Sequence, residues 1–178
     1  RGNEMRRYLT EFDVITQIFN AAWAANWGFI PFTEAEIRHM AKELKPLIDA
    51  RYFWFAEMDG EPVGFIIGIP DVNEAIRDID GKLLPFGLFK LIWRLKVKGI
   101  TGGRVPLMGI KRKLQSTAVG AAIPLYLIGK LREAGLANGY RWIELSWILE
   151  ENTAMRHICE VLCGPAYKTY RIYGKELA

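Results

Sequence analysis

The chain has 178 residues, of which 51% are hydrophobic, 12% aromatic and 25% charged, with a formal net charge of +4. This balance excludes intrinsic disorder, and the length predicts one domain over residues 1–178. The two cysteines exclude a disulfide framework, and we expect both to be small buried residues of a cytoplasmic, reducing environment.

Two helices and a hairpin are predicted in the N-terminal part of the chain. Apolar residues recur at helical spacing over 11–24. Thr33 and Glu36 form a capping box, which predicts that a second helix begins there. The pair Asp59-Gly60 separates two strand-like segments and predicts a hairpin, since glycine accepts the positive φ of a tight turn.

Two further helices are predicted at 71–80 and 85–99, and the second of them lies within a basic stretch. Residues 82–113 contain nine Lys or Arg and no Asp or Glu, so the rest of the chain carries 4 − 9 = −5. Such an excess favours an anionic partner, either a phosphorylated cofactor, an acidic lipid or a nucleic acid. The apolar window 83–95 is too short to span a membrane but is compatible with a helix on a membrane surface.

The C-terminal part alternates strands and helices. Gly102-Gly103 is expected to break the chain, and Gly164-Pro165 to end the last helix. The predicted order is strand 104–110, helix 118–138, strand 140–149, helix 151–163 and strand 166–177. Together with the hairpin, this order predicts an α/β or α+β layered domain.

The polar turn at 115–120 leads directly into the predicted helix 118–138. A helix start exposes unpaired N–H groups and a partial positive charge, and small side chains let an anion approach them. With Lys111, Arg112 and Lys113 just ahead, the turn is typical of a phosphate or pyrophosphate site, although a plain helix cap is the alternative. A P-loop and the G-x-G-x-x-G fingerprint are both absent, and two distant histidines exclude a metal site.

The sequence Gln115-Ser-Thr-Ala-Val-Gly120 resembles the Q/R-x-x-G-x-G/A pyrophosphate turn of the GCN5-related N-acetyltransferases. Residues 107–110 resemble the central fourth strand of that family, and 143–155 resemble its fifth strand followed by an Asn. The resemblance extends from about residue 12 to the end of the chain. It is strongest to a bacterial subgroup in which the domain can be the C-terminal part of a longer chain, which suits the start at Arg1.

The resemblance implies a mixed, mostly antiparallel central sheet flanked by helices, with the first strand missing or reduced to 4–9. It also implies that acetyl-CoA or another acyl-CoA lies between the fourth and fifth strands. Backbone groups of Met108, Gly109 and Ile110 would pair with pantetheine, which Asn152 would also contact. The pyrophosphate would be held by the amides of Gln115, Ser116, Thr117, Ala118, Val119, Gly120 and Ala121.

Three residues depart from the expected pattern. Ala118 replaces the first glycine of the turn and lacks that residue's access to positive φ. Pro124 should kink the long helix, and Pro106 is unfavourable within a strand.

The catalytic groups are less clearly marked than the cofactor site. Many members of the family place a proton-donating Tyr where this chain has Cys159, which we interpret as an apolar residue. Tyr170 and its neighbours in the last predicted strand offer a replacement. The candidates for the base are Glu144 and Ser146, which share one face of the fifth strand, and Glu150 at its end, unless the amine arrives deprotonated.

The sequence therefore predicts an enzyme that transfers an acyl group to an amine of a small molecule or peptide, by direct attack in a ternary complex. No nucleic acid, metal or membrane span is expected, and a homodimer is compatible with the sequence. A non-catalytic acyl-CoA-binding domain and a basic module for nucleic acid or a membrane surface are the alternatives. Six aromatic residues indicate either a bulky apolar acceptor pocket or core packing: Trp23, Trp27, Phe29, Phe32, Phe86 and Trp93.

Overall fold

The computed structural model describes residues 8–24, 29–44 and 48–176. The chain forms two compact units, residues 1–146 and 147–178. The single domain expected over 1–178, as the C-terminal part of a longer protein, stays a prediction.

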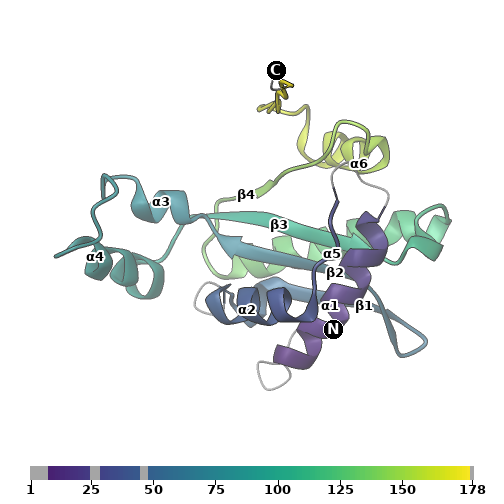
Figure 1. Ribbon diagram of the computed structural model, residues 1–178, viewed down its shortest axis with the longest axis horizontal. Coiled ribbons are helices and arrows are strands. Elements are labelled where there is room, and N and C mark those ends of the chain that lie inside the picture. Colours follow the sequence, from purple (N-terminus) through teal and green to yellow (C-terminus); the bar gives the residue numbers. More distant parts are fainter. Residues whose placement is uncertain (1–7, 25–28, 45–47, 177–178) are drawn as a thin grey trace. The chain divides into compact units, whose positions relative to one another are not determined.

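The first unit is built on a four-stranded sheet in the order β1-β2-β3-β4 (Figure 1). β1 and β2 pair antiparallel, as do β2 and β3, whereas β3 and β4 are parallel. The sheet is therefore mixed and mostly antiparallel, as predicted. The strands are β1 (Phe53–Met58), β2 (Glu61–Pro70), β3 (Gly102–Ile110) and β4 (Trp142–Leu145).

Local turn and cap signals are confirmed in this unit. Asp59 and Gly60 join β1 to β2 with φ values of 54° and 79°, the left-handed values that a tight hairpin turn of this kind requires. Thr33 and Glu36 form the reciprocal capping box: the Thr33 amide donates to the Glu36 carboxylate at 2.9 Å, and the Glu36 amide donates to the Thr33 hydroxyl at 3.3 Å.

Helices cover both faces of the sheet. α1 (Tyr8–Trp23) and α2 (Glu34–Leu44) share a core with Phe53, Phe55 and Phe65, and α5 (Ala118–Ala137) shares a second core with Ile66. Adjacent residues of a strand point to opposite faces, so Phe65 and Ile66 contribute to different cores. The result is a three-layer arrangement of helices, sheet and helix. Of the segment suggested as a remnant first strand, Tyr8 and Leu9 begin α1, and 4–7 lie outside the described residues.

Three of the six aromatic residues considered for an acceptor pocket are partly buried and pack against the core, whereas Phe86 and Trp93 are exposed. The rings of Trp23, Phe29 and Phe32 lie 4.8, 5.6 and 5.5 Å from the ring of Phe19, in the core beneath α1. Trp27 lies outside the described residues. The core-packing alternative therefore accounts for these three side chains.

Glycines and a proline in β3 are placed by long-range contacts. Gly102 and Gly103 do not break the chain but belong to β3, where a Cβ would meet the rings of Trp142 and Tyr140 at 2.0 and 2.7 Å. Pro106 lies where the β2–β3 register is irregular and one residue beyond the last β3–β4 pair, Val105 with Leu145. A missing N–H is tolerated there, because regular pairing is already interrupted. α5 likewise continues through Pro124.

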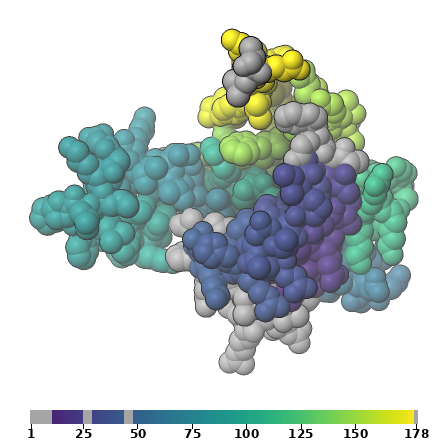
Figure 2. Space-filling model, viewed as in Figure 1, coloured from purple at the N-terminus to yellow at the C-terminus, as the bar shows by residue number. Residues whose placement is uncertain are grey.

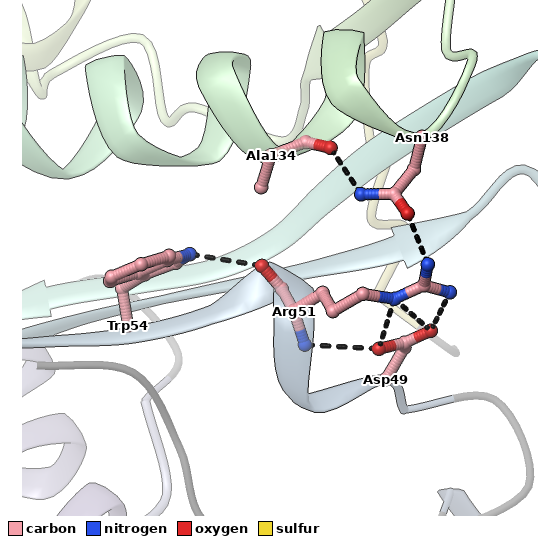
Figure 3. A network of polar contacts seen from close by, with 5 residues as sticks. All are labelled: Asp49, Arg51, Trp54, Ala134 and Asn138. Carbon is pink, nitrogen blue, oxygen red and sulfur yellow. Dashed lines mark hydrogen bonds and ion pairs between the residues drawn. The ribbon is translucent and has the colours of Figure 1, made fainter.

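A polar network connects the last turn of α5 to η2 (Ala50–Tyr52), the short 3-10 helix before β1 (Figure 3). The Arg51 guanidinium bonds the Asp49 carboxylate and the Asn138 side-chain oxygen, and Asn138 donates to the Ala134 carbonyl at 2.7 Å. The side-chain hydrogen bond from Arg51 lowers the pKa of Asp49. This network fixes the end of α5 that is distant from the 115–120 turn.

A basic segment lies between β2 and β3. It contains α3 (Val72–Ile76), α4 (Gly87–Trp93) and η3 (Arg94–Lys98), a short π-helical turn. The helix predicted over 71–80 is shorter than expected, because residues 77–81 form turns that include a left-handed Asp80.

The second unit contains α6 (Thr153–Cys163), which ends at Gly164 with a φ of 84°, as predicted. The strand predicted over 166–177 is wrong: residues 164–176 contain no strand. A strand needs a neighbour to accept its hydrogen bonds, and the described part of this unit has none. The alternating side chains there are exposed, with Tyr170 at 72% and Ile172 at 86%.

Candidate active site

The edge of β3 that faces away from β2 is only partly paired with β4. Its pairing with β4 ends at Val105 and Leu145, whereas β3 continues through Ile110. Ser146, the residue after β4, donates its hydroxyl to the Val105 carbonyl at 3.5 Å. Within the described residues, no strand pairs with this edge of β3 from Leu107 to Ile110. The strand predicted over 140–149 is therefore shorter than expected, since β4 spans Trp142–Leu145.

Hydrogen-bond alternation decides which backbone groups face this free edge. The Lys111 amide donates to the Val63 carbonyl at 2.8 Å, so Lys111 and Val63 form a hydrogen-bonded pair. In an antiparallel ladder the next such pair is Gly109 with Phe65, two residues along each strand. The intervening residues, Met108 and Ile110, direct their backbone groups away from β2. Gly109 differs from these neighbours, since its own N–H and C=O face β2.

The turn that follows β3 uses several of its own amides. It contains η4 (Arg112–Leu114), a 3-10 helix, and Thr117 as the N-cap of α5. The amides of Gln115, Thr117 and Ala121 donate to backbone carbonyls, and that of Gly120 donates to the Thr117 hydroxyl at 3.0 Å. No acceptor within the described chain is recorded for three exposed positions: Ser116, Ala118 and Val119.

Gly120 allows the turn to fold tightly onto α5. A Cβ on Gly120 would lie 1.8 Å from the Leu114 carbonyl oxygen, so only glycine fits at this contact. Ala118, in contrast, is the first residue of α5 and is not among the described residues with positive φ. The replacement of the first glycine of the turn by Ala118 therefore costs no strain.

Cations line the entrance to this turn. Lys111 forms an ion pair with Glu61 at 3.3 Å, and Arg112 and Lys113 are exposed. The side-chain Nε2 of Gln115 donates to the Ile110 backbone carbonyl at 3.2 Å and so connects the turn to the end of β3. Unengaged amides at a helix start beside exposed cations are a geometry that can bind phosphate groups.

The predicted catalytic residues occupy different places. Ser146 ends the first unit, next to β4. Glu150 and Tyr170 are exposed in the second unit, and Asn152 caps α6 there by accepting from the Met155 amide at 3.2 Å. Their roles stay predictions. The sequence did not indicate Arg104, which pairs with Glu144 at 3.1 Å across β3 and β4; the opposite charges on the two strands were the available signal.

The expectation that both cysteines are buried is wrong for Cys163, which is exposed. Cys159 is half-buried, and burial raises the pKa of its thiol to about 11. The thiol is therefore protonated at neutral pH, in keeping with an apolar role. We expect iodoacetamide at pH 8 to modify the exposed Cys163 at least about tenfold faster than Cys159, because only the thiolate reacts. Peptide mass spectrometry over time measures both rates. Modification of the two cysteines at equal rates, at pH 8 and at lower pH, would contradict the protonated state of Cys159.

A pocket of about 250 Å³ lies elsewhere in the first unit, lined by residues that include Arg51, Lys96 and Asn138. Asn138 follows the last residue of the 20-residue α5, so a helix length of about 30 Å separates it from the turn. The pocket is therefore separate from the candidate site. The described residues include no cluster of three or more His, Cys, Asp or Glu that could hold a metal ion. None of their helices is both long and apolar enough to cross a membrane.

Two curated proteins are similar to the chain over nearly its whole length, although no family model matches it. It is 51% identical over 177 residues to the bacterial ceramide synthase of Caulobacter vibrioides, covering 99% of this chain and 46% of that protein. It is 44% identical over 172 residues to protein YghO of Escherichia coli, covering 97% and 44%. The chain thus spans about half the length of these relatives.

Solved structures of acetyltransferases share the architecture. AAC(6')-Iy, in complex with the bisubstrate analogue CoA-S-monomethyl-acetylneamine, matches with a TM-score of 0.58 and 12% identity over 99% of this chain and 97% of that one. A possible acetyltransferase from Clostridium difficile matches with a TM-score of 0.56 and 12% identity, over 100% and 96%. At these identities the likeness concerns the fold, and the chain has the fold of the GCN5-related N-acetyltransferases.

Proposed function

We propose that the chain is an acyl-CoA-dependent N-acyltransferase that acylates the amine of a sphingoid-type long-chain base. The observation that carries the acyl-CoA part is the free edge of β3 beside the start of α5. Outward backbone groups at Met108 and Ile110 lie a few residues before a turn with unengaged amides. The fold supports acyl transfer in general, and the acceptor is the finer part of the proposal.

The residues present suit the two polar parts of CoA. The amides of Ser116, Ala118 and Val119 would hold the pyrophosphate, with Arg112 and Lys113 close by for further phosphates. The amide groups of pantetheine would extend the sheet by pairing with the outward groups of β3. Acyl-CoA supplies the activated acyl group as a thioester.

In the proposed reaction the acceptor nitrogen bonds to the thioester carbonyl carbon while the carbon–sulfur bond breaks. The amine loses one proton and the CoA sulfur gains one. An outward N–H of Met108 or Ile110 would stabilise the negative charge that develops on the carbonyl oxygen. Ser146 or Glu150 would accept the amine proton, and Tyr170 would protonate the sulfur.

The acceptor is proposed from the relative named a ceramide synthase, which is 51% identical across nearly all of this chain. A ceramide is the amide of a fatty acid and a long-chain amino alcohol, so its synthesis is an N-acylation. The same chemistry, on an apolar amine, agrees with the acyltransferase predicted from the 115–120 turn.

The test is an assay of the purified chain with sphinganine and either palmitoyl-CoA or acetyl-CoA. We expect an N-acyl product by mass spectrometry and an equal amount of free CoA thiol by a colorimetric thiol assay. Acyl-CoA binding without product, across a broad panel of amines, would contradict catalysis and favour a binding domain. Absence of binding at millimolar acyl-CoA, measured by calorimetry, would contradict the whole proposal.

A further inference from the structure

Residues 82–98, here called the arm, form a part of the first unit with almost no interior of its own. In Figure 1 this teal segment with α4 extends beyond the end of the sheet, and Figure 2 shows it at one side of the first unit; only its last turn, which includes Lys96 and Val97, lines a pocket shared with Arg51 and Asn138. No residue of α4 or η3 is buried. α4 packs mainly on η3, and η3 on α3, rather than on the sheet.

The arm nevertheless carries many large apolar side chains. A helix of a globular protein normally turns its apolar stripe toward the core, but here the stripe faces outward. An apolar patch of this density marks an interaction surface. Eight exposed residues form it: Leu83, Leu84, Phe86, Leu88, Phe89, Ile92, Trp93 and Val97, of which Leu84, Phe86, Phe89 and Val97 are 71–79% exposed.

Only cations accompany these apolar side chains. The arm contains five Lys or Arg and no Asp or Glu. Lys90 and Arg94 bind Asp78 at the base of the arm, and these contacts lower the pKa of that carboxyl group, Arg94 having the larger effect. Lys82 and Lys98, at the two ends of the arm, are exposed. The complementary partner is therefore anionic as well as apolar.

A nucleic acid meets only half of this description. Phosphates would suit the lysines, and bases would stack on the aromatic rings. Five of the eight apolar residues are aliphatic, however, and a nucleic acid offers no apolar layer to cover Leu84 or Val97. A bilayer with anionic headgroups offers both a negative surface and a hydrocarbon layer just beneath it.

We propose that the arm is a membrane-docking element that inserts its apolar side chains into the interface of a bilayer containing anionic lipids. Lys82 and Lys98 contact the headgroups, while Phe86, Phe89 and Val97 enter the boundary with the acyl chains. The inference rests on the arm alone, and it holds whichever acceptor the enzyme uses. Docking of this kind places the chain on the surface of a membrane without crossing it.

The test is co-sedimentation of the chain with vesicles of phosphatidylcholine alone or of phosphatidylcholine with phosphatidylglycerol. We expect binding to the anionic vesicles that weakens as salt is added, and much weaker binding to the neutral ones. The triple variant Phe86→Ser, Phe89→Ser, Val97→Ser should lose about tenfold or more in partitioning, because three exposed apolar side chains no longer enter the interface. Circular dichroism checks that the variant is folded.

Matched variants separate the arm from the general surface. The triple variant Ile30→Ser, Val161→Ser, Ile172→Ser removes side chains that are 71–86% exposed elsewhere, and it should bind as the wild type does. The double variant Lys82→Gln, Lys98→Gln should weaken vesicle binding several-fold more than the control double variant Lys42→Gln, Lys175→Gln. Because these lysines are exposed, the two double variants still test the proposal if the arm triple variant misfolds.

Four outcomes overturn the proposal. The first is the absence of binding to anionic vesicles, and the second is equal binding to the neutral and anionic ones. The third is vesicle binding that the arm variants leave unchanged. The fourth is binding to a single-stranded RNA homopolymer that is as tight as vesicle binding and is unaffected by the apolar substitutions. None of these readouts requires catalysis, so a failed acylation assay leaves this test intact.

Discussion

Replacement of Gly120 with alanine is expected to lower the affinity for acyl-CoA by about ten- to a hundredfold, since loss of one hydrogen bond to a charged phosphate costs about 1.5–3 kcal/mol. The new Cβ would lie 1.8 Å from the Leu114 carbonyl oxygen and 2.6 Å from its carbon, so the turn must move away from α5. The amides of Ser116, Ala118 and Val119 would then be displaced from their present positions. Calorimetric titration with acyl-CoA measures the loss.

Gly129→Ala is the matched control on the same helix. A Cβ at Gly129 meets nothing within 4 Å, and alanine is favoured over glycine in a helix by about 0.5–1 kcal/mol. This variant should be slightly more stable than the wild type and bind acyl-CoA equally well. If Gly120→Ala is folded and binds as tightly as Gly129→Ala, the turn is not the anion site.

Features that depend on neighbouring residues could be predicted from the sequence. The hairpin at Asp59-Gly60 and the capping box of Thr33 and Glu36 need only local backbone chemistry, and the structure contains both. The end of α6 at Gly164 is of the same kind. The start of α5 was also predictable, because a Thr side chain three residues before Gly120 can cap its amide.

Features that depend on distant residues could not be predicted in this way. Gly102 is followed by a second glycine, a pair that typically separates two secondary-structure elements. In the structure Gly102 belongs to a strand, because the Trp142 ring occupies the space where its side chain would lie. The alternation of Tyr170 and Ile172 is typical of a strand, yet residues 164–176 form none. The exposure of the arm could not be predicted either, because the sequence pattern around an apolar residue such as Phe89 does not show whether its side chain is buried.

For the candidate site, the sequence indicated the 115–120 turn but not which of its amides are already engaged within the chain. Which amides are engaged depends on the backbone pairing. The backbone groups of Gly109 face β2, and the Thr117 hydroxyl accepts the Gly120 amide as the cap of α5. A motif specifies residue types at a spacing, whereas the direction of each N–H follows from register. The register of β2 and β3 is set by the packing of residues such as Phe65 beneath α1.

Phe65→Ala is therefore expected to be the most destabilising of the substitutions considered, with a loss of about 3–5 kcal/mol in the free energy of unfolding. Phe65 is 0% exposed, lies opposite Phe55 in the β1–β2 pairing and packs in the core beneath α1. Its removal leaves a cavity that rigid strands on both sides cannot close. Against a typical total stability of about 5–15 kcal/mol, the loss should appear as a large shift of the urea midpoint with an unchanged slope.

Phe89→Ala makes the same chemical change on the arm, where the ring is 73% exposed, and should alter stability by less than about 0.5 kcal/mol. Equal losses in the two variants would contradict the assignment of Phe65 to the core. The Phe65 ring also lies 2.9 Å from where a Cβ on Gly109 would be, so it supports β3 between Met108 and Ile110. Phe65→Ala should consequently weaken acyl-CoA binding even at temperatures where the chain is folded, whereas Phe89→Ala should leave that binding unchanged and reduce only vesicle binding.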